Sequence, residues 1–163
     1  LHPIILDAGT TTSQIAKALR RARDGRELTV ITNALGVAVE LVGLPGVNLV
    51  LTGGVLNEVT QCVAGFHAEQ FLSQFHVHKA FISAGGVSGD GVTNTNTLEV
   101  QIKRHMIAVA DRAILVVTAD KIGRTALAPF ARITEFSLLL TNRDAPQQEI
   151  ARIREQGVEV MLC

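Results

Sequence analysis

The sequence has no excess of charge of either sign. Lysine and arginine total 15, aspartate and glutamate also total 15, and the formal net charge at pH 7 is zero. A chain without net charge has no overall electrostatic attraction to DNA, RNA or an anionic membrane. We therefore expect no membrane partner and no general affinity of this chain for nucleic acid.

Long apolar segments and cysteines are also scarce. No apolar run reaches the roughly 18 residues of a membrane-spanning helix, and the N-terminus lacks the basic segment of a signal peptide. The two cysteines, Cys62 and Cys163, predict no disulfide framework, so a reducing cytoplasm is the simplest setting. The sequence begins at Leu1 directly in a strand-like run, and we therefore expect it to be a piece of something longer.

What the sequence does contain is apolar residues in short runs. It has 163 residues, 47% of them hydrophobic, which is enough for one domain with a full core and excludes a disordered chain. Nearly all the runs are continuously apolar, which is typical of strands buried on both faces of a parallel sheet. The predicted strands are residues 4–6, 28–31, 48–51, 80–82, 114–117, 137–140 and 158–162.

Helical patterns alternate with these strands. The alternation indicates repeated βαβ units, so the predicted fold class is α/β, a Rossmann-like layered sheet with helices on both faces. The predicted helices are residues 13–23, 35–42, 67–74, 97–110 and 147–156.

Most of the predicted strands end in small, hydroxyl or glycine residues. In open α/β sheets, ligands bind outside the carboxyl ends of the strands. Any one of these turns can be an ordinary turn or helix N-cap, because Ser, Thr, Asn and Asp favour both. Several of them on one rim favour a shared ligand site. The strand ends are Asp7-Ala8-Gly9-Thr10, Thr32-Asn33, Thr52-Gly53-Gly54, Ser83-Ala84-Gly85-Gly86, Thr118-Ala119-Asp120-Lys121 and Thr141-Asn142.

The first of these turns has the sharpest local pattern. A strand runs into Asp7 and Gly9, and Thr10, Thr11 and Thr12 open a helix. The first N–H groups of a helix lack internal partners and carry the positive end of its dipole. With threonine hydroxyls beside them and a glycine that allows close approach, they suit a phosphate or carboxylate. The alternative is a strong N-cap with nothing bound.

The helix predicted over residues 97–110 carries two opposite charges on its apolar side. At about 100° per residue, Glu99 and Lys103 fall in the middle of the apolar arc. The alternative, an i,i+4 surface pair, predicts a place on the polar face instead. Because a buried ion pair is costly unless something else uses it, we expect a polar pocket under this helix. In that pocket Lys103 faces an anion, and Glu99 holds Lys103 or a sugar hydroxyl.

The remaining polar candidates are weaker. Lys121 follows a strongly apolar strand and is expected at the same rim, where it would neutralise a phosphate; a solvated turn is the alternative. His76 and His78 have metal-like spacing but no evident third ligand, and Cys62 and His67 do not complete a zinc pattern. No nucleophile–base pair stands out. We therefore expect no metal and no cofactor.

Together these segments closely resemble the C-terminal effector domain of the DeoR family of bacterial transcription regulators. The motifs occur in the family's order and at family-like spacing, and the resemblance covers essentially the whole chain, residues 1–163. The matching stretches are residues 5–12, 30–33, 51–54, 80–83, 85–87, 91–93, 99–107 and 120–124.

The resemblance implies a fold similar to sugar-phosphate isomerases and CoA transferases. It implies a non-catalytic effector-binding and oligomerisation domain of a repressor, one that senses a phosphorylated sugar or a related catabolic intermediate. It further implies a homo-oligomer, dimer or tetramer. DNA would be bound only through a preceding helix-turn-helix domain that is absent from this chain.

Other functions remain open at this point. A sugar-phosphate isomerase or deaminase of the same fold would need a base, and Asp7, Glu99 and Asp120 are the candidates. A purely structural oligomerisation module fits poorly with charges inside an apolar helical face.

Site residues follow from the resemblance position by position. They are phosphate contacts at Gly9, Thr10, Thr11 and Thr12, pocket residues Asp7, Thr32, Asn33, Gly53 and Gly54, and charges from Glu99, Lys103 and Lys121. One position departs from the family, which usually has an aspartate three residues before the lysine that matches Lys121. Here Thr118 stands at that position and the acid is Asp120. The departure leaves open which acid, if either, contacts the sugar, and it bears on effector choice.

Overall fold

A parallel sheet forms the centre of the protein. The computed structural model describes residues 2–22 and 25–163. The sheet has seven strands in the order β12-β11-β9-β6-β1-β2-β3, and every neighbouring pair is parallel. The strands are β1 (Ile4–Leu6), β2 (Leu28–Thr32), β3 (Val47–Leu51), β6 (Val77–Ile82), β9 (Ala110–Val116), β11 (Leu138–Thr141) and β12 (Glu159–Leu162).

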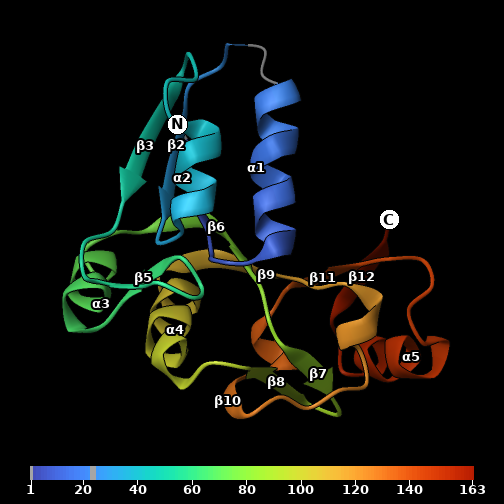
Figure 1. Ribbon diagram of the computed structural model, residues 1–163. Helices are drawn as coiled ribbons and strands as arrows, with labels where there is room; N and C mark the ends of the chain where they lie inside the picture. The colour runs from blue at the N-terminus through green and yellow to red at the C-terminus, as the bar shows by residue number, and fades with distance from the viewer. Residues whose placement is uncertain (1, 23–24) are drawn as a thin grey trace.

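Helices cover both faces of this sheet (Figure 1). Because successive strand residues point to opposite faces, Ile4 and Leu6 of β1 belong to one apolar cluster and Ile5 to another. The first cluster includes Ala16 of α1 (Thr10–Ala22) and Val37 of α2 (Leu35–Leu41). The second includes residues of α3 (Phe66–Leu72), α4 (Val100–Ala108) and α5 (Gln147–Glu155). The predicted layered α/β fold is therefore confirmed.

The strand order places a switch point between β1 and β6. From β1 the chain continues through α1 and α2 to β2 and β3 on one side, whereas β6, β9, β11 and β12 build the other side. In open sheets of this kind the crevice at the switch point is the usual place for a ligand. The residues that follow β1 and β6, from Asp7 and from Ser83, meet there.

Two smaller sheets lie outside the predicted elements. A hairpin pairs β4 (Val55–Asn57) with β5 (Cys62–Ala64), and a three-stranded sheet joins β10 (Ala128–Arg132), β8 (Gly91–Asn94) and β7 (Gly86–Ser88). Sequence patterns did not predict these strands because each is only 3 to 5 residues long. All except β5 also carry glycine, asparagine or proline instead of a continuous apolar run, and β5 is apolar but has only three residues. α4 packs between the central sheet and β10.

The predicted helices are present, with shifted ends. α1 begins at Thr10, three residues earlier than predicted, and its predicted end at residue 23 lies outside the described residues. The predicted helix over residues 97–110 divides into a 3-10 turn, η1 (Thr97–Glu99), and α4. The turn forms because the Asn96 side chain accepts a hydrogen bond from the Leu98 N–H. Two further 3-10 turns are η2 (Ala119–Lys121) and η3 (Ile133–Glu135). Among residues 2–22 and 25–163, no helix has the length and apolarity needed to cross a bilayer.

Candidate functional site

A pocket of about 220 Å³ opens at the switch point. It lies at the carboxyl ends of β1, β6 and β9, and its volume is below the roughly 300–1,000 Å³ typical of pockets for drug-sized ligands. A pocket of this volume fits a small metabolite. The lining residues are Ala8, Gly9, Thr10, Thr11, Thr60, Ser83, Ala84, Gly85, Asn94, Thr95, Glu99, Val117, Thr118 and Lys121.

The N-terminus of α1 forms one wall of the pocket. The first helical hydrogen bond runs from the Ser13 N–H to the Gly9 carbonyl, at 3.1 Å. The N–H groups of Thr10 and Thr11 precede that bond and so have no acceptor within the helix. Both residues line the pocket, which therefore receives free donors and the positive end of the helix dipole.

Gly9 is required by the close approach of the two strand ends. Its φ is +155°, and a Cβ added there would lie 2.8 Å from both Cβ and Oγ of Ser83. Any larger residue would therefore separate the turn after β1 from the turn after β6. Thr12 is fully buried, and its hydroxyl donates to the Gly9 carbonyl at 2.9 Å. This hydrogen bond stabilises the turn between β1 and α1.

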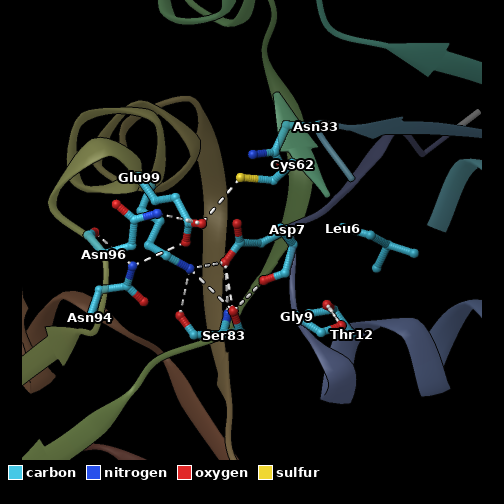
Figure 2. A network of polar contacts seen from close by, with 12 residues as sticks. Leu6, Asp7, Gly9, Thr12, Asn33, Cys62, Ser83, Asn94, Asn96 and Glu99 are labelled. Atoms are coloured by element: carbon cyan, nitrogen blue, oxygen red, sulfur yellow. Dashed lines mark hydrogen bonds and ion pairs between the residues drawn. The ribbon is translucent and has the colours of Figure 1, made fainter. Parts of the chain in front are cut away.

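Next to the pocket, a buried ion pair joins the two strand ends (Figure 2). Lys103 and Asp7 are each 1% exposed, and the ammonium group bonds directly to Asp7 Oδ2. The same ammonium donates to the Ser83 carbonyl at 3.0 Å, while the Ser83 N–H donates to Asp7 Oδ2 at 3.0 Å. Removing either charge would leave the other uncompensated in the interior. Asp7, Ser83 and Lys103 thus hold β1, β6 and α4 together, and we call these three residues the clamp.

The prediction that Glu99 and Lys103 lie on the buried side of their helical segment is confirmed. Of the two expected partners of Glu99, Lys103 is not bonded to it, and contact with a sugar hydroxyl stays a prediction. Lys103 pairs with Asp7. Glu99 is 7% exposed and accepts hydrogen bonds from the Cys62 thiol at 3.1 Å and the Asn94 amide at 3.1 Å. The Asn96 amide lies 3.5 Å from the same carboxylate. Neutral donors on β5, on β8 and at the N-cap of η1 therefore bind Glu99, while Lys103 pairs with Asp7.

Burial fixes the protonation state of Cys62. Burial, together with the neighbouring Glu99 carboxylate, raises the pKa of the Cys62 thiol to about 11. At neutral pH the thiol therefore keeps its proton and acts as a hydrogen-bond donor to Glu99. It is not a nucleophile.

Lys121 and Thr118 reach the pocket from the end of β9. Lys121 is 38% exposed, and its ammonium lies 3.6 Å from the Asp120 carboxylate. The Thr118 hydroxyl donates to Asp120, and this hydrogen bond lowers the pKa of that exposed carboxyl below its ordinary value. Of the two positions that depart from the family pattern, Thr118 lines the pocket, whereas Asp120 is not among its lining residues.

Four of the predicted site residues lie outside the pocket lining, and three of them have close contacts elsewhere in the protein. The Thr32 hydroxyl donates to the Leu6 carbonyl at 2.7 Å, and the Asn33 amide donates to the Val63 carbonyl at 3.1 Å. A Cβ on Gly54 would lie 2.7 Å from the Ala64 carbonyl oxygen, and Gly53 before it is exposed. Thr32 thus ties the end of β2 to β1, while Asn33 and Gly54 lie against β5 of the β4–β5 hairpin.

The predicted residues thus fall into three groups. Gly9, Thr10, Thr11, Glu99 and Lys121 line the pocket. Asp7 and Lys103 are buried and bond to the lining residue Ser83, and the others lie outside the lining. These others are Thr12, Thr32, Asn33, Gly53 and Gly54.

Several pocket residues were absent from the predicted site. Ser83, Ala84 and Gly85 could have been predicted from sequence, because they are small or hydroxyl residues that directly follow an apolar strand, as Asp7 to Thr10 do. Thr60, Asn94 and Thr95 had no such signal, because they lie on or next to the short strands that sequence patterns did not predict.

The histidines with metal-like spacing contact an aspartate. His76 Nε2 lies 2.8 Å from Asp111 Oδ1, and His78 Nδ1 lies 3.6 Å from Asp111 Oδ2. In the part of the chain that the structure describes, no group of three or more His, Cys, Asp or Glu residues is arranged to hold a metal ion.

Solved structures share the fold at low sequence identity. Ribose 5-phosphate isomerase A from Methanocaldococcus jannaschii superposes with a TM-score of 0.51 at 13% identity, covering 74% of this chain and 46% of that one. At that identity the likeness concerns the fold alone. It agrees with the expected similarity to sugar-phosphate isomerases.

Sequence comparison identifies the family. The chain is 33% identical over 162 residues to a putative aga operon transcriptional repressor of Escherichia coli O157:H7, covering 99% of this chain and 59% of that protein. It is also 33% identical over 159 residues to the transcriptional repressor GlcR of Bacillus subtilis (strain 168), covering 98% of this chain and 60% of that protein. The chain thus spans about three fifths of the length of these relatives. A sequence profile described as the DeoR C-terminal sensor domain matches residues 2–143. The chain belongs to the family of DeoR C-terminal sensor domains.

Proposed function

We propose that this chain is the effector-binding domain of a transcriptional repressor, and that its effector is a phosphorylated sugar or a related catabolic intermediate. The observation that carries the proposal is the pocket at the switch point, where the N-terminus of α1 and Lys121 face the same small cavity. Relatives of the chain that are named as transcriptional repressors support the regulatory part of the proposal.

The phosphate would be bound by Gly9, Thr10, Thr11 and Lys121, which we call the rim of the pocket. Thr10 and Thr11 supply N–H and hydroxyl donors, Gly9 allows the close approach, and Lys121 supplies the charge. A micromolar dissociation constant requires about −8 kcal/mol. Several charge-assisted hydrogen bonds of about 1.5–3 kcal/mol each, with further contacts to sugar hydroxyls, reach that value. Asp7 and Lys103 would act by fixing the distance between the two strand ends.

Regulation requires that the ligand prefers one conformation or assembly of the protein. The pocket draws its walls from turns after three strands and from Thr60 on the β4–β5 hairpin, so a bound ligand would hold these segments in one arrangement. We propose that this arrangement alters the assembly of a homo-oligomer, dimer or tetramer. A helix-turn-helix domain in the remainder of the full-length protein would bind DNA in the cytoplasm.

We propose no catalysis for the pocket. A general base must reach the proton that it abstracts, and Asp7 is 1% exposed and bonded to Lys103 and Ser83. Glu99 does line the pocket, so turnover of ribose and glucosamine phosphates by the purified chain is the direct check. Measurable turnover that Glu99→Gln abolishes would establish an enzyme instead.

Calorimetry with a panel of phosphorylated sugars tests the binding proposal. At least one sugar phosphate should bind and raise the melting temperature, because a ligand that binds only the folded state stabilises it. Lys121→Met should weaken binding about tenfold or more. Lys17→Met is the matched control, because it removes the same charge from α1 at a position outside the pocket lining. Absence of binding across the panel, or equal losses in the two variants, would contradict the proposal.

A further inference from the structure

The interior beside the pocket carries more negative than positive charge. Asp7, Glu99 and Lys103 are all more than nine-tenths buried, so two carboxylates share the interior with one ammonium group. That ammonium bonds Asp7 and the Ser83 carbonyl. The clamp is therefore neutral by itself, and the charge of Glu99 is the excess.

Among residues 2–22 and 25–163, Glu99 also has no charged partner at hydrogen-bond distance. Its hydrogen bonds come from the Cys62 thiol and the Asn94 and Asn96 amides, which are neutral donors. A buried carboxylate held only by neutral donors is stabilised less than one held by an ammonium or guanidinium group. Since Glu99 lines the pocket, a cationic group on the ligand is placed to supply the missing partner.

Two buried oxygen atoms near Glu99 also lack hydrogen-bond donors. Among the described residues, Asp7 Oδ1 and Asn33 Oδ1 are buried and accept no hydrogen bond. The charge of Asp7 contributes to the raised pKa of the Cys62 thiol, as does that of Glu99, so both carboxylates act on one small region. The interior next to Glu99 is thus rich in acceptors and poor in donors.

The positive elements of the pocket lie on its other side. Figure 2 shows Gly9 and Thr12, at the start of α1, on one side of Ser83, and Glu99 with Asn94 on the opposite side. The α1 N-terminus offers N–H donors to an anion, while Glu99 offers a carboxylate. The pocket therefore has one end for an anion and another for a cation or hydrogen-bond donor.

We propose that this pocket selects a phosphate ester that also carries a primary ammonium group, an amino sugar phosphate in chemical class, with the ammonium bound at Glu99. The inference rests on the proposed function and names the ligand class of the same site. Lys103 does not oppose a second cation here because Asp7 already neutralises it. An ammonium group donates three hydrogen bonds where a hydroxyl donates one, and it compensates the charge that a hydroxyl leaves.

The test compares ligands that differ only by amine against hydroxyl. The pairs are glucosamine 6-phosphate with glucose 6-phosphate, galactosamine 6-phosphate with galactose 6-phosphate, and phosphoethanolamine with 2-hydroxyethyl phosphate; inorganic phosphate gives the baseline. Dissociation constants are measured by calorimetry at pH 7 for the 163-residue chain and for its Glu99→Gln variant. In at least one pair the amine should bind the original chain about tenfold more tightly or better, since a charge-assisted hydrogen bond contributes that much. In the variant the ratio should fall to near one.

Each other outcome overturns a distinct statement. Phosphate esters that bind with no preference for the amine in any pair would overturn the ligand class and leave the proposed effector function standing. An amine preference that persists in Glu99→Gln would overturn the assignment to Glu99. No binding of any ester or of inorganic phosphate would overturn both the inference and the proposed function.

Discussion

The clamp and the rim of the pocket meet at the same switch point but differ in how their polar groups are used. In the clamp, Lys103 and Asp7 are 1% exposed and bond each other and Ser83. On the rim, Thr10 and Thr11 have N–H groups without helical acceptors, and Lys121 is 38% exposed. The charged residues that sequence patterns assign together to a ligand thus divide into a buried pair, Asp7 and Lys103, and the partly exposed Lys121, whose ion pair with Asp120 leaves it accessible to a ligand.

The division predicts that clamp substitutions act mainly on stability and rim substitutions mainly on binding. Removing Lys103 should have the largest effect. Lys103→Met leaves the Asp7 carboxylate buried without its partner, which costs about 3–5 kcal/mol. Urea unfolding measures this loss.

A double variant provides the control for that prediction. Asp7→Asn combined with Lys103→Met removes both charges of the clamp, so part of the lost stability should return. A single Lys103→Met variant as stable as the original chain would show that the clamp does not hold the strand ends together.

Gly9→Ala should have the next largest effect, because the new Cβ would lie 2.8 Å from Ser83 at a backbone φ of +155°. Strain of this kind costs about 1–3 kcal/mol, and ligand affinity should fall with it because the turn moves. Gly43→Ala is the matched control, since its φ is +75° and a Cβ there meets nothing within 4 Å. Equal losses in the two variants would mean that the approach of Gly9 to Ser83 has no role of its own.

Lys121→Met should leave stability almost unchanged, because exposed ion pairs such as that with Asp120 contribute little, about 0–1 kcal/mol. Ligand affinity should nevertheless fall about tenfold, as expected for the loss of one charged hydrogen bond. Unfolding and calorimetry on the same preparation separate the two effects. A loss of stability comparable to that of Lys103→Met would remove the distinction between rim and clamp.

The smallest effect is expected at Thr118. Its hydroxyl lowers the pKa of the Asp120 carboxyl, so Thr118→Val should raise that pKa toward the ordinary aspartate value. A depressed folded-state pKa stabilises the protein above the ordinary pKa, and this stabilisation is lost as pH falls through the depressed value. Because Asp120 is exposed, the change should be visible in an NMR titration of its carboxyl carbon. An unchanged titration curve would contradict the assigned cause.

The strands of the central sheet were predictable from sequence because they form short, mainly apolar runs. The inner strands β1 and β11 are largely buried, whereas the edge strands β3 and β12 are partly exposed. Ile4 to Leu6, for example, are all buried. The buried positions of Glu99 and Lys103 were predictable from helical geometry alone. Their partners were not, because Asp7 lies 96 residues from Lys103 and Cys62 lies 37 residues from Glu99 in the chain. Pairing over such distances depends on the strand order, and periodicity does not specify strand order.

The pocket residues on or next to the short strands could not be predicted from sequence for a different reason. Asn94 ends β8, whose sequence Gly-Val-Thr-Asn has no periodicity that separates a strand from a loop. Thr60 lies in the turn of the β4–β5 hairpin, whose strands are three residues each. Side chains of this kind are placed by tertiary packing, and only the structure reveals them.

The most direct test of the division between rim and clamp is an amide NMR titration with a sugar phosphate that binds in calorimetry. Binding at the rim predicts large shifts for the N–H signals of Gly9, Thr10 and Thr11, with small shifts for Thr32 and Asn33, whose side chains are bonded within the protein. The contrary result is a ligand that shifts Thr32 and Asn33 and leaves Thr10 and Thr11 unmoved, which would place the effector elsewhere on the sheet.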